Sequence, residues 1–119
     1  MKNYPAAVKS GLCLLVFAFA YSLSHASQLG KEMNDADDEL NVVYANVLSG
    51  LPSPELKEQL RVSQRAWVAF KDAEVALHAN LYPESKGGLF TRLELTEQRI
   101  KQLKSIGERT SGFGYDQGQ

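Results

Sequence analysis

Apolar residues recur at three- and four-residue steps in three separate stretches of this chain. The stretches run from Met33 to Leu51, from Leu56 to Leu81 and from Leu89 to Ile106. This spacing places the apolar side chains on one face of an α-helix, and no stretch alternates at the two-residue period of a strand. Each stripe is one-sided and too short to be stable alone in water, and the connections are short. The pattern predicts an all-α fold, a three-helix up-down-up antiparallel bundle.

Residues that start and stop helices lie between the first two stretches. Asn34 or Asp35 is a suitable N-cap for the first helix, and Gly50 would end it. The second helix has the clearest start, because Ser53 is a good N-cap and Pro54 is preorganised for the first helical position. These signals predict a short connection between two helices.

The end of the second helix and the whole of the third are marked by Pro and Gly. Pro83 is expected to end the second helix, and Glu84–Gly88 is expected to form a flexible turn. Gly107 is a candidate C-terminal stop for the third helix. The last ten residues, 110–119, contain three glycines and no helical stripe, so we expect a disordered tail.

The stripe of the second helix alternates steps of four and three, as in a coiled-coil seam. This pattern predicts Trp67 and Phe70 as central core residues, because both lie near the middle of the stripe. Burial of each large side chain would contribute about 1.5–3 kcal/mol. The stripe consists of Leu56, Leu60, Ser63, Trp67, Phe70, Glu74, Leu77 and Leu81.

The first residues have the features of an export signal. Lys2 and Lys9 give a basic start, Gly11–Tyr21 is an apolar run, and Ser24–Ala26 is a small-x-small cleavage site. The run is about half the ~20 residues that a membrane span needs, so we prefer a signal peptide to a membrane helix. We expect a signal peptide at 1–26, a helical domain at 27–109 and a tail at 110–119. The mature protein would be periplasmic or secreted, without a membrane span.

Cleavage after Ala26 would leave 93 of the 119 residues, enough for one domain. Removal of Lys2 and Lys9 leaves 11 of the 13 basic residues against 14 acidic ones, a net charge of −3. This charge excludes a generic nucleic-acid-binding protein, which would need a basic face. It mildly favours a cationic partner, and it is also ordinary for a soluble protein. Cys13 lies in the signal, so the mature chain has no cysteine.

The residues of known catalytic and metal sites are missing from the pattern. His78 is the only histidine of the mature chain, and no sequence feature links it to a nucleophile. No nucleophile elbow, phosphate loop or His-x-x-x-His pair occurs. The acidic run Asp35–Glu39 fails as a calcium loop, because Leu40 stands at the glycine position and Asn46 at the final glutamate position. We therefore expect no enzyme, no metal and no cofactor.

Charged residues inside or beside the apolar stripes indicate a different role. Glu74 occupies a position of the second stripe, and a buried carboxylate needs a partner. Arg99 lies one turn from Leu95 and Leu103, and Arg65 and Asp72 are seven residues apart. Two interpretations stay open: the four form an interhelical polar network, or all of them extend to solvent.

Three blocks, in this order and at these spacings, resemble the LprI-type lysozyme inhibitors, a family of small exported bacterial domains. The blocks are Asp38–Tyr44, Gln64–Glu74, and Gly87-Gly88 followed by Leu95–Leu103. The chain departs from the family where relatives often carry cysteines, for example at Val75. The resemblance implies a helical inhibitor without catalysis, and the network would fix helix register. Its motif residues are Leu40, Asn41, Tyr44, Gln64, Arg65, Trp67, Asp72, Glu74, Thr96 and Arg99.

The resemblance also suggests a protein partner, with a lysozyme as the candidate. Host lysozymes are basic and have a cleft with two carboxylates. Acidic residues would steer the protein toward a basic rim, and a lysine could approach the carboxylates. The alternative is an envelope adaptor that pairs its second helix with another exported protein. The proposed contact residues are Asp35, Asp37, Asp38, Glu39, Lys86, Gly87 and Gly88.

Overall fold

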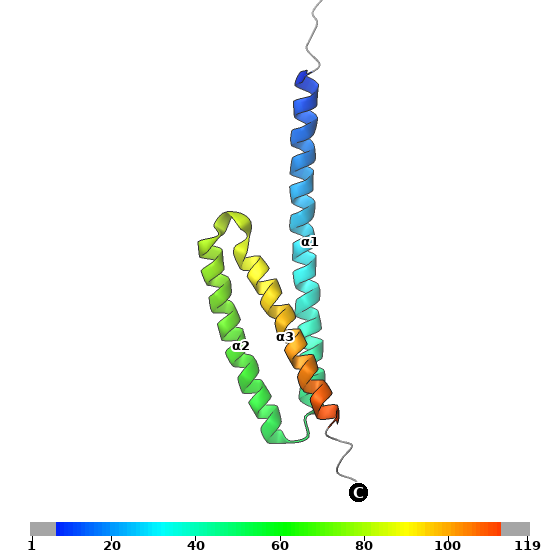
Figure 1. Cartoon of the computed structure of the whole chain (residues 1–119), viewed down its shortest axis with the longest axis vertical. Helices are drawn as coiled ribbons and strands as arrows, with labels where there is room; N and C mark the ends of the chain where they lie inside the picture. The colour runs from blue at the N-terminus through cyan, green and yellow to red at the C-terminus, as the bar shows by residue number, and fades with distance from the viewer. Residues whose placement is uncertain (1–6, 113–119) are drawn as a thin grey trace, which may run out of the picture. The chain divides into compact units, whose positions relative to one another are not determined.

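The computed structural model describes the backbone of residues 7–112 and the side chains of residues 25–111. Three α-helices follow one another: α1 (Ala7–Gly50), α2 (Pro54–Leu81) and α3 (Gly87–Gly112), with a short 3₁₀ helix, η1 (Pro83–Ser85), before α3 (Figure 1). Residues 7–112 contain no strand, which confirms the predicted all-α class. The chain forms two compact units, one ending at Glu32 and one beginning at Met33, and the second unit contains the bundle.

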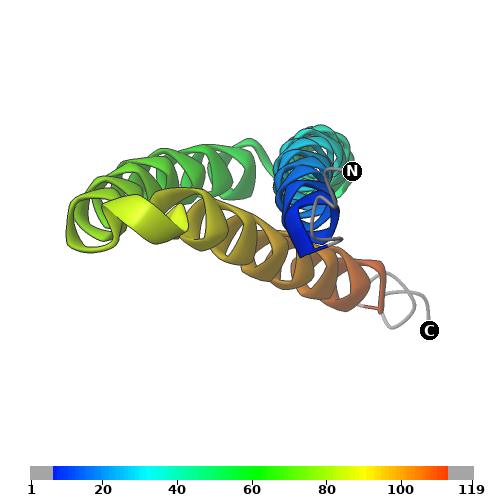
Figure 2. The ribbon, with the colours of Figure 1, turned by 90° about the horizontal axis from the view of Figure 1, so that it is seen from above.

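Helices α2 and α3 form an antiparallel hairpin. Gly88, at the start of α3, lies against Ala79 near the end of α2, whereas Arg99 contacts Ser63 further toward the start of α2. Figures 1 and 2 show the two helices side by side. Residues 33–50 of α1 pack against α3 and run parallel to it, since the contact of Asp37 with Arg92 is followed by that of Val47 with Gly107. These contacts are compatible with the predicted up-down-up order.

The end of α1 and both ends of α2 lie where the sequence predicts them. Helix α1 ends at Gly50. Ser53 is the N-cap of α2, and its hydroxyl accepts a hydrogen bond of 3.2 Å from the backbone N–H of Leu56. Pro54 occupies the first helical position, where its missing N–H removes no helical hydrogen bond. Helix α2 ends at Leu81, before Pro83.

Other predicted boundaries are wrong. Asn34 and Asp35 lie inside α1 and do not start it, because the helix continues upstream of them through Gly30. Gly87 and Gly88 belong to the first turn of α3 and not to a flexible turn. The turn is made by η1 and Lys86, which has a left-handed backbone (φ 55°). A left-handed conformation is uncommon for a residue other than glycine, and here it ends η1 directly before α3.

Gly107 does not stop α3, which continues to Gly112. A Cβ atom at Gly107 would lie 3.3 Å from Cγ2 of Val47, so the small residue serves close packing on α1. The first residues of the predicted tail are helical, and the Thr110 hydroxyl donates to the backbone oxygen of Gly107 at 2.9 Å. Residues 113–119 of that tail lie outside the described residues.

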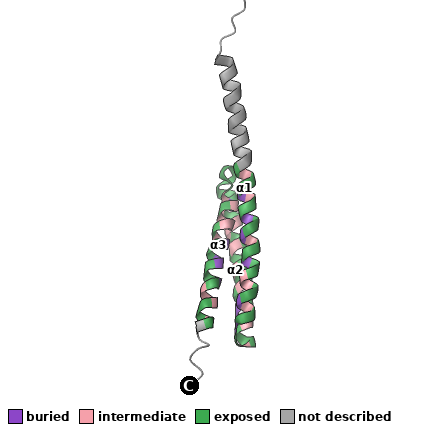
Figure 3. Cartoon of the chain, turned by 90° about the vertical axis from the view of Figure 1, so that its right-hand side faces the viewer, coloured by how far each residue is buried: buried purple, intermediate pink, exposed green. Residues whose placement is uncertain are grey.

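The core of the bundle is a narrow aliphatic seam shared by the three helices. Leu103 of α3 has no exposed surface and lies at its centre. Figure 3 shows narrow stripes of buried positions, with intermediate and exposed positions over the rest of the described helices. Val43, Tyr44, Leu48, Trp67 and Ile106 pack around the seam and are partly buried. The fully packed members are Leu40, Val47, Leu51, Leu60, Ile100 and Leu103.

Phe70 is not a core residue, because 52% of its surface is exposed, and Trp67 is only partly buried. The predicted stripe of α2 divides into two rows, each with a seven-residue step. The row that contains Leu60 and Trp67 faces the neighbouring helices, whereas the row that contains Phe70 and Leu77 lies at the flank of the contact. Residues seven positions apart lie on the same side of a helix. The rotation of α2 about its own axis therefore decides which of the two rows is buried.

Gly88 allows the backbones of α2 and α3 to approach closely. A Cβ atom at this position would lie 2.9 Å from the backbone oxygen of Val75 and 2.9 Å from Cβ of Ala79. Gly88→Ala is expected to destabilise the protein by about 1–3 kcal/mol, although the same change in an open helix stabilises it by about 1 kcal/mol. Urea unfolding shows whether the substitution lowers or raises the free energy of unfolding.

The matched control is Gly50→Ala, because a Cβ atom at Gly50 meets nothing within 4 Å. This variant should unfold at the same or a slightly higher urea concentration than the wild type. A Gly88→Ala protein as stable as the control would contradict the close helix approach.

Candidate functional site

Arg99 is the centre of a polar cluster inside the bundle. It extends from α3 to α2, where its Nε donates to Oε1 of Gln64 at 3.0 Å and its Nη2 donates to Oγ of Ser63 at 3.0 Å. Its Nη1 donates to Oε1 of Gln102 at 3.2 Å on α3 itself. Only 7% of the residue surface is exposed. The three acceptors fix the guanidinium plane, as a charged group with several donors requires on burial.

Aromatic side chains complete the cluster. The guanidinium lies 5.9 Å from the ring centre of Trp67, and the ammonium of Lys71 lies 5.2 Å from the same ring. Both cations are within the range of a cation–π contact. Burial lowers the pKa of Arg99, while Tyr44 of α1 acts in the opposite direction. The ordinary pKa of arginine is so high that the side chain stays charged.

Five of the residues singled out in the sequence meet at this cluster or beside it. Tyr44 comes from α1, Gln64 and Trp67 from α2, and Thr96 and Arg99 from α3. The hydroxyl of Thr96 is completely buried and has no hydrogen-bond partner among the described residues. An unpaired buried hydroxyl is costly, so the packing around Thr96 must offset it.

The remaining motif residues lie elsewhere. Leu40 is in the core, and Asn41 is exposed. Asp72 pairs with Lys71 at 3.5 Å. The carboxylate of Glu74 lies 3.8 Å from the ring of His78 on the same helix. Arg65 bonds Glu58 at 3.2 Å on the surface of α2.

The predicted network is therefore right for Arg99 and wrong for Arg65, Asp72 and Glu74, since none of these three contacts Arg99. Neither of the two open interpretations holds for all four residues. Sequence reasoning missed Ser63 and Gln102 as partners of Arg99. Ser63 carried a usable signal, because it is a polar residue inside the second apolar stripe.

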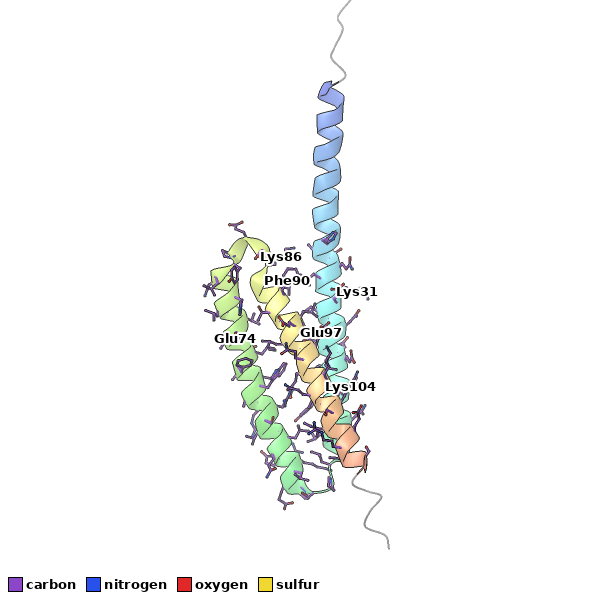
Figure 4. All side chains as sticks on the ribbon, in the orientation of Figure 1. Lys31, Glu74, Lys86, Phe90, Glu97 and Lys104 are labelled. Carbon is purple, nitrogen blue, oxygen red and sulfur yellow. The ribbon has the colours of Figure 1, made fainter. Side chains whose placement is uncertain are left out.

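The acidic run of α1 is partly occupied by ion pairs to α3. Asp37 accepts a hydrogen bond from Arg92, and Glu39 accepts one of 2.6 Å from Lys104. Figure 4 shows Lys104 on the side of α3 next to α1. Asp35 and Asp38 are exposed. Asp37 and Glu39 thus hold two helices together and have less freedom to meet a partner.

The turn between α2 and α3 presents one charged side chain of the proposed contact set. Lys86 is exposed and lies at this turn (Figure 4). Gly88 is buried against α2, and Gly87 is half-buried against Tyr82 and His78. The two glycines therefore position the turn, and Lys86 is the side chain that a partner would meet.

Two recesses flank the Arg99 cluster. One, of about 350 Å³, is lined by Tyr44, Arg61, Gln64, Arg65 and Val68. Glu58 bonds both arginines of this recess, which holds the pKa of that carboxyl below its usual range. The other, of about 520 Å³, lies along α3 and is lined by Arg99, Lys101, Gln102, Ser105, Ile106 and Arg109. Both recesses are open to solvent, and each could admit a side chain of a partner.

Within the described residues, no group of three His, Cys, Asp or Glu side chains could hold a metal ion. No helix in that part of the chain is both long and apolar enough to cross a membrane.

The comparison with protein families identifies the chain. The family model described as lysozyme inhibitor LprI matches residues 21–103, more than half of the sequence. The chain belongs to the LprI family, as its three sequence blocks suggest. Its match spans the acidic run of α1, all of α2 and the part of α3 that carries Thr96 and Arg99. No curated protein and no solved structure matches the chain.

Proposed function

We propose that the exported form of this protein binds a lysozyme and blocks its cleft without chemistry of its own. The family match carries the proposal, because the family is described by lysozyme inhibition and the match covers the helices of the bundle. An inhibitor needs a rigid surface and no catalytic group. The Arg99 cluster supplies rigidity, since it ties α2 to α3 through side chains of both helices.

Residues 1–26 are proposed to act as the export signal, which would place the protein in the periplasm or outside the cell. Lysozymes that attack a cell wall act in the same compartment. Export would thus bring the inhibitor and its target together.

We infer that exposed acidic residues of α1 accelerate the encounter with a basic lysozyme. Asp35, Asp38 and Glu39 are exposed, while Asp37 and Glu39 also form ion pairs with Arg92 and Lys104 of α3. Charges at an interface rim mainly change the rate of association. Lys86 at the turn could then approach the carboxylates of the cleft.

Replacement of Asp35 and Asp38 by Asn tests this function. Association with immobilised c-type or g-type lysozyme should slow, most at low salt, because the Debye length is about 10 Å at 0.1 M ionic strength. The dissociation rate should stay unchanged. The matched control is Glu94→Gln with Glu97→Gln, which removes the same charge from exposed residues of α3. An equal slowing in the control would contradict local steering, and no binding to any lysozyme would contradict the proposed function.

A second candidate is an adaptor that pairs α2 with a helix of another exported protein. Exposed apolar side chains in the C-terminal half of α2 favour it, since Phe70 is 52%, Leu77 49% and Leu81 57% exposed. Exposed apolar side chains on a helix are typical of helix-in-groove contacts. An adaptor would bind a partner without any effect on lysozyme activity.

A further inference from the structure

The five basic residues of α3 fall into two groups. Arg92 and Lys104 are paired with Asp37 and Glu39 of α1. The other three, Arg99, Lys101 and Arg109, have no carboxylate partner among the described residues. The first group fastens the bundle. The second group forms no ion pair with a described residue, and in this sense its three cations are uncompensated.

These three uncompensated cations line one recess. They lie together along the 520 Å³ recess of α3, whose other lining residues are Gln102, Ser105 and Ile106. No acidic residue belongs to this lining. The recess formed by Arg61 and Arg65 is different, because Glu58 bonds both of its arginines. Of these two recesses, the one on α3 has lining cations without a carboxylate partner among the described residues, whereas both arginines of the other pair with Glu58.

Arg99 forms the rigid wall of the recess. Its guanidinium is held by Gln64, Ser63 and Gln102 before any partner arrives, so little entropy is lost when an anion binds near it. Arg109 is anchored loosely by a hydrogen bond of 3.0 Å to Ser105, and Lys101 is exposed. A fixed guanidinium beside two exposed cations is suited to bind a carboxylate, which is planar and has two acceptor oxygens.

We propose that the α3 recess receives a carboxylate side chain from the cleft of the target lysozyme. This inference rests on the proposed function, and it moves the inhibitory contact from the acidic run and the turn to the C-terminal half of α3. Glycoside hydrolases of this kind carry two carboxylates that flank the bond to be cleaved. A basic recess is complementary to them, whereas the basic outer surface of a lysozyme would be repelled from it. The charge of the recess therefore favours binding at the cleft of the lysozyme over binding at its outer surface.

Part of this charge has a simpler structural explanation. Arg109 lies in the last turn of α3, where a cation also interacts favourably with the helix dipole. Lys101 would be solvated in any exposed helix. Neither effect requires Arg99, Lys101 and Arg109 to line the same recess, and neither predicts a dependence on a carboxylate partner.

The first test compares two double variants of the exported protein. Lys101→Gln with Arg109→Gln should raise the dissociation constant for a bound lysozyme by about tenfold or more, because charge-assisted hydrogen bonds are lost. Arg61→Gln with Arg65→Gln removes the same charge from the compensated recess and is expected to change it by less than about threefold. Both pairs are exposed, and circular dichroism checks that the helices remain. Equal effects, or wild-type affinity of the first variant, would overturn the proposal.

The second test needs no lysozyme. Acetate is titrated into the exported protein while NMR follows the amides of residues 99–109 and the arginine Nε–H groups, with chloride as the reference salt. Shifts should concentrate at Arg99, Lys101 and Arg109 and disappear in the Lys101→Gln, Arg109→Gln variant. Shifts no larger than those at Arg61 and Arg65 would overturn the recess. Localised acetate shifts without any lysozyme binding would instead reject the proposed function and leave the carboxylate site standing.

Discussion

Leu103→Ala is expected to lower the free energy of unfolding by about 2–5 kcal/mol. Leu103 has no exposed surface and belongs to one buried cluster with Leu40 of α1 and Leu60 of α2. Its truncation leaves a cavity that three rigid helices cannot fill at once. A small domain has a total stability of about 5–15 kcal/mol, so the loss would be a large part of it. Urea unfolding followed by circular dichroism measures the change.

Val62→Ala is the matched control for this prediction. Val62 is 52% exposed on α2, so its replacement should change the stability by less than about 0.5 kcal/mol. A Leu103→Ala protein that unfolds at the same urea concentration as the control would contradict the packing of α3 at the centre of the bundle.

Arg99→Met is expected to lower the free energy of unfolding by about 2–4 kcal/mol, the second large effect. Methionine fills much of the same space, yet Gln64, Ser63 and Gln102 lose their common donor. The contact with Trp67 also disappears. The same urea experiment measures the loss, and the Trp67 emission should shift, because the ring loses the cation beside it.

Arg99→Lys separates geometry from charge. Lysine keeps the positive charge, but one ammonium cannot serve three acceptors on two helices as a planar fork does. We expect it to recover less than half of the loss seen with Arg99→Met. Full recovery would mean that charge alone matters, and wild-type stability of Arg99→Met would mean that the cluster does not hold α2 to α3.

The helices could be predicted because their signals are local. Three- and four-residue periodicity does not depend on what a helix packs against, and Ser53 with Pro54 sets the start of α2 through its own hydrogen bond. Glycine is different, because the same residue either breaks a helix or lets two helices approach. Gly88 and Gly107 allow close approach, to α2 and α1 respectively. The sequence does not reveal this role, because it depends on where the neighbouring helix lies.

The candidate site was predictable only in part for a similar reason. A charged residue beside an apolar stripe is a candidate for a buried polar group, and this position singled out Arg99. The partners depend on the rotation of one helix against another, which spacing along the chain does not contain. Glu74 lies on the stripe of α2 and is half-buried, yet its carboxylate lies 3.8 Å from the ring of His78 on the same helix. The same rotation leaves Phe70 exposed and brings Ser63 to Arg99.

Cell-wall lysis in the presence of the exported protein tests the proposed inhibition most directly. Lysozymes of the c and g types are mixed with increasing amounts of the protein, and the clearing of a cell-wall suspension is followed. We predict that the lysis rate of at least one type falls and levels off near an equimolar ratio, and that Lys101→Gln with Arg109→Gln shifts the inhibition curve to higher concentrations. Unchanged lysis by both types, at protein concentrations that saturate any binding, would contradict the account.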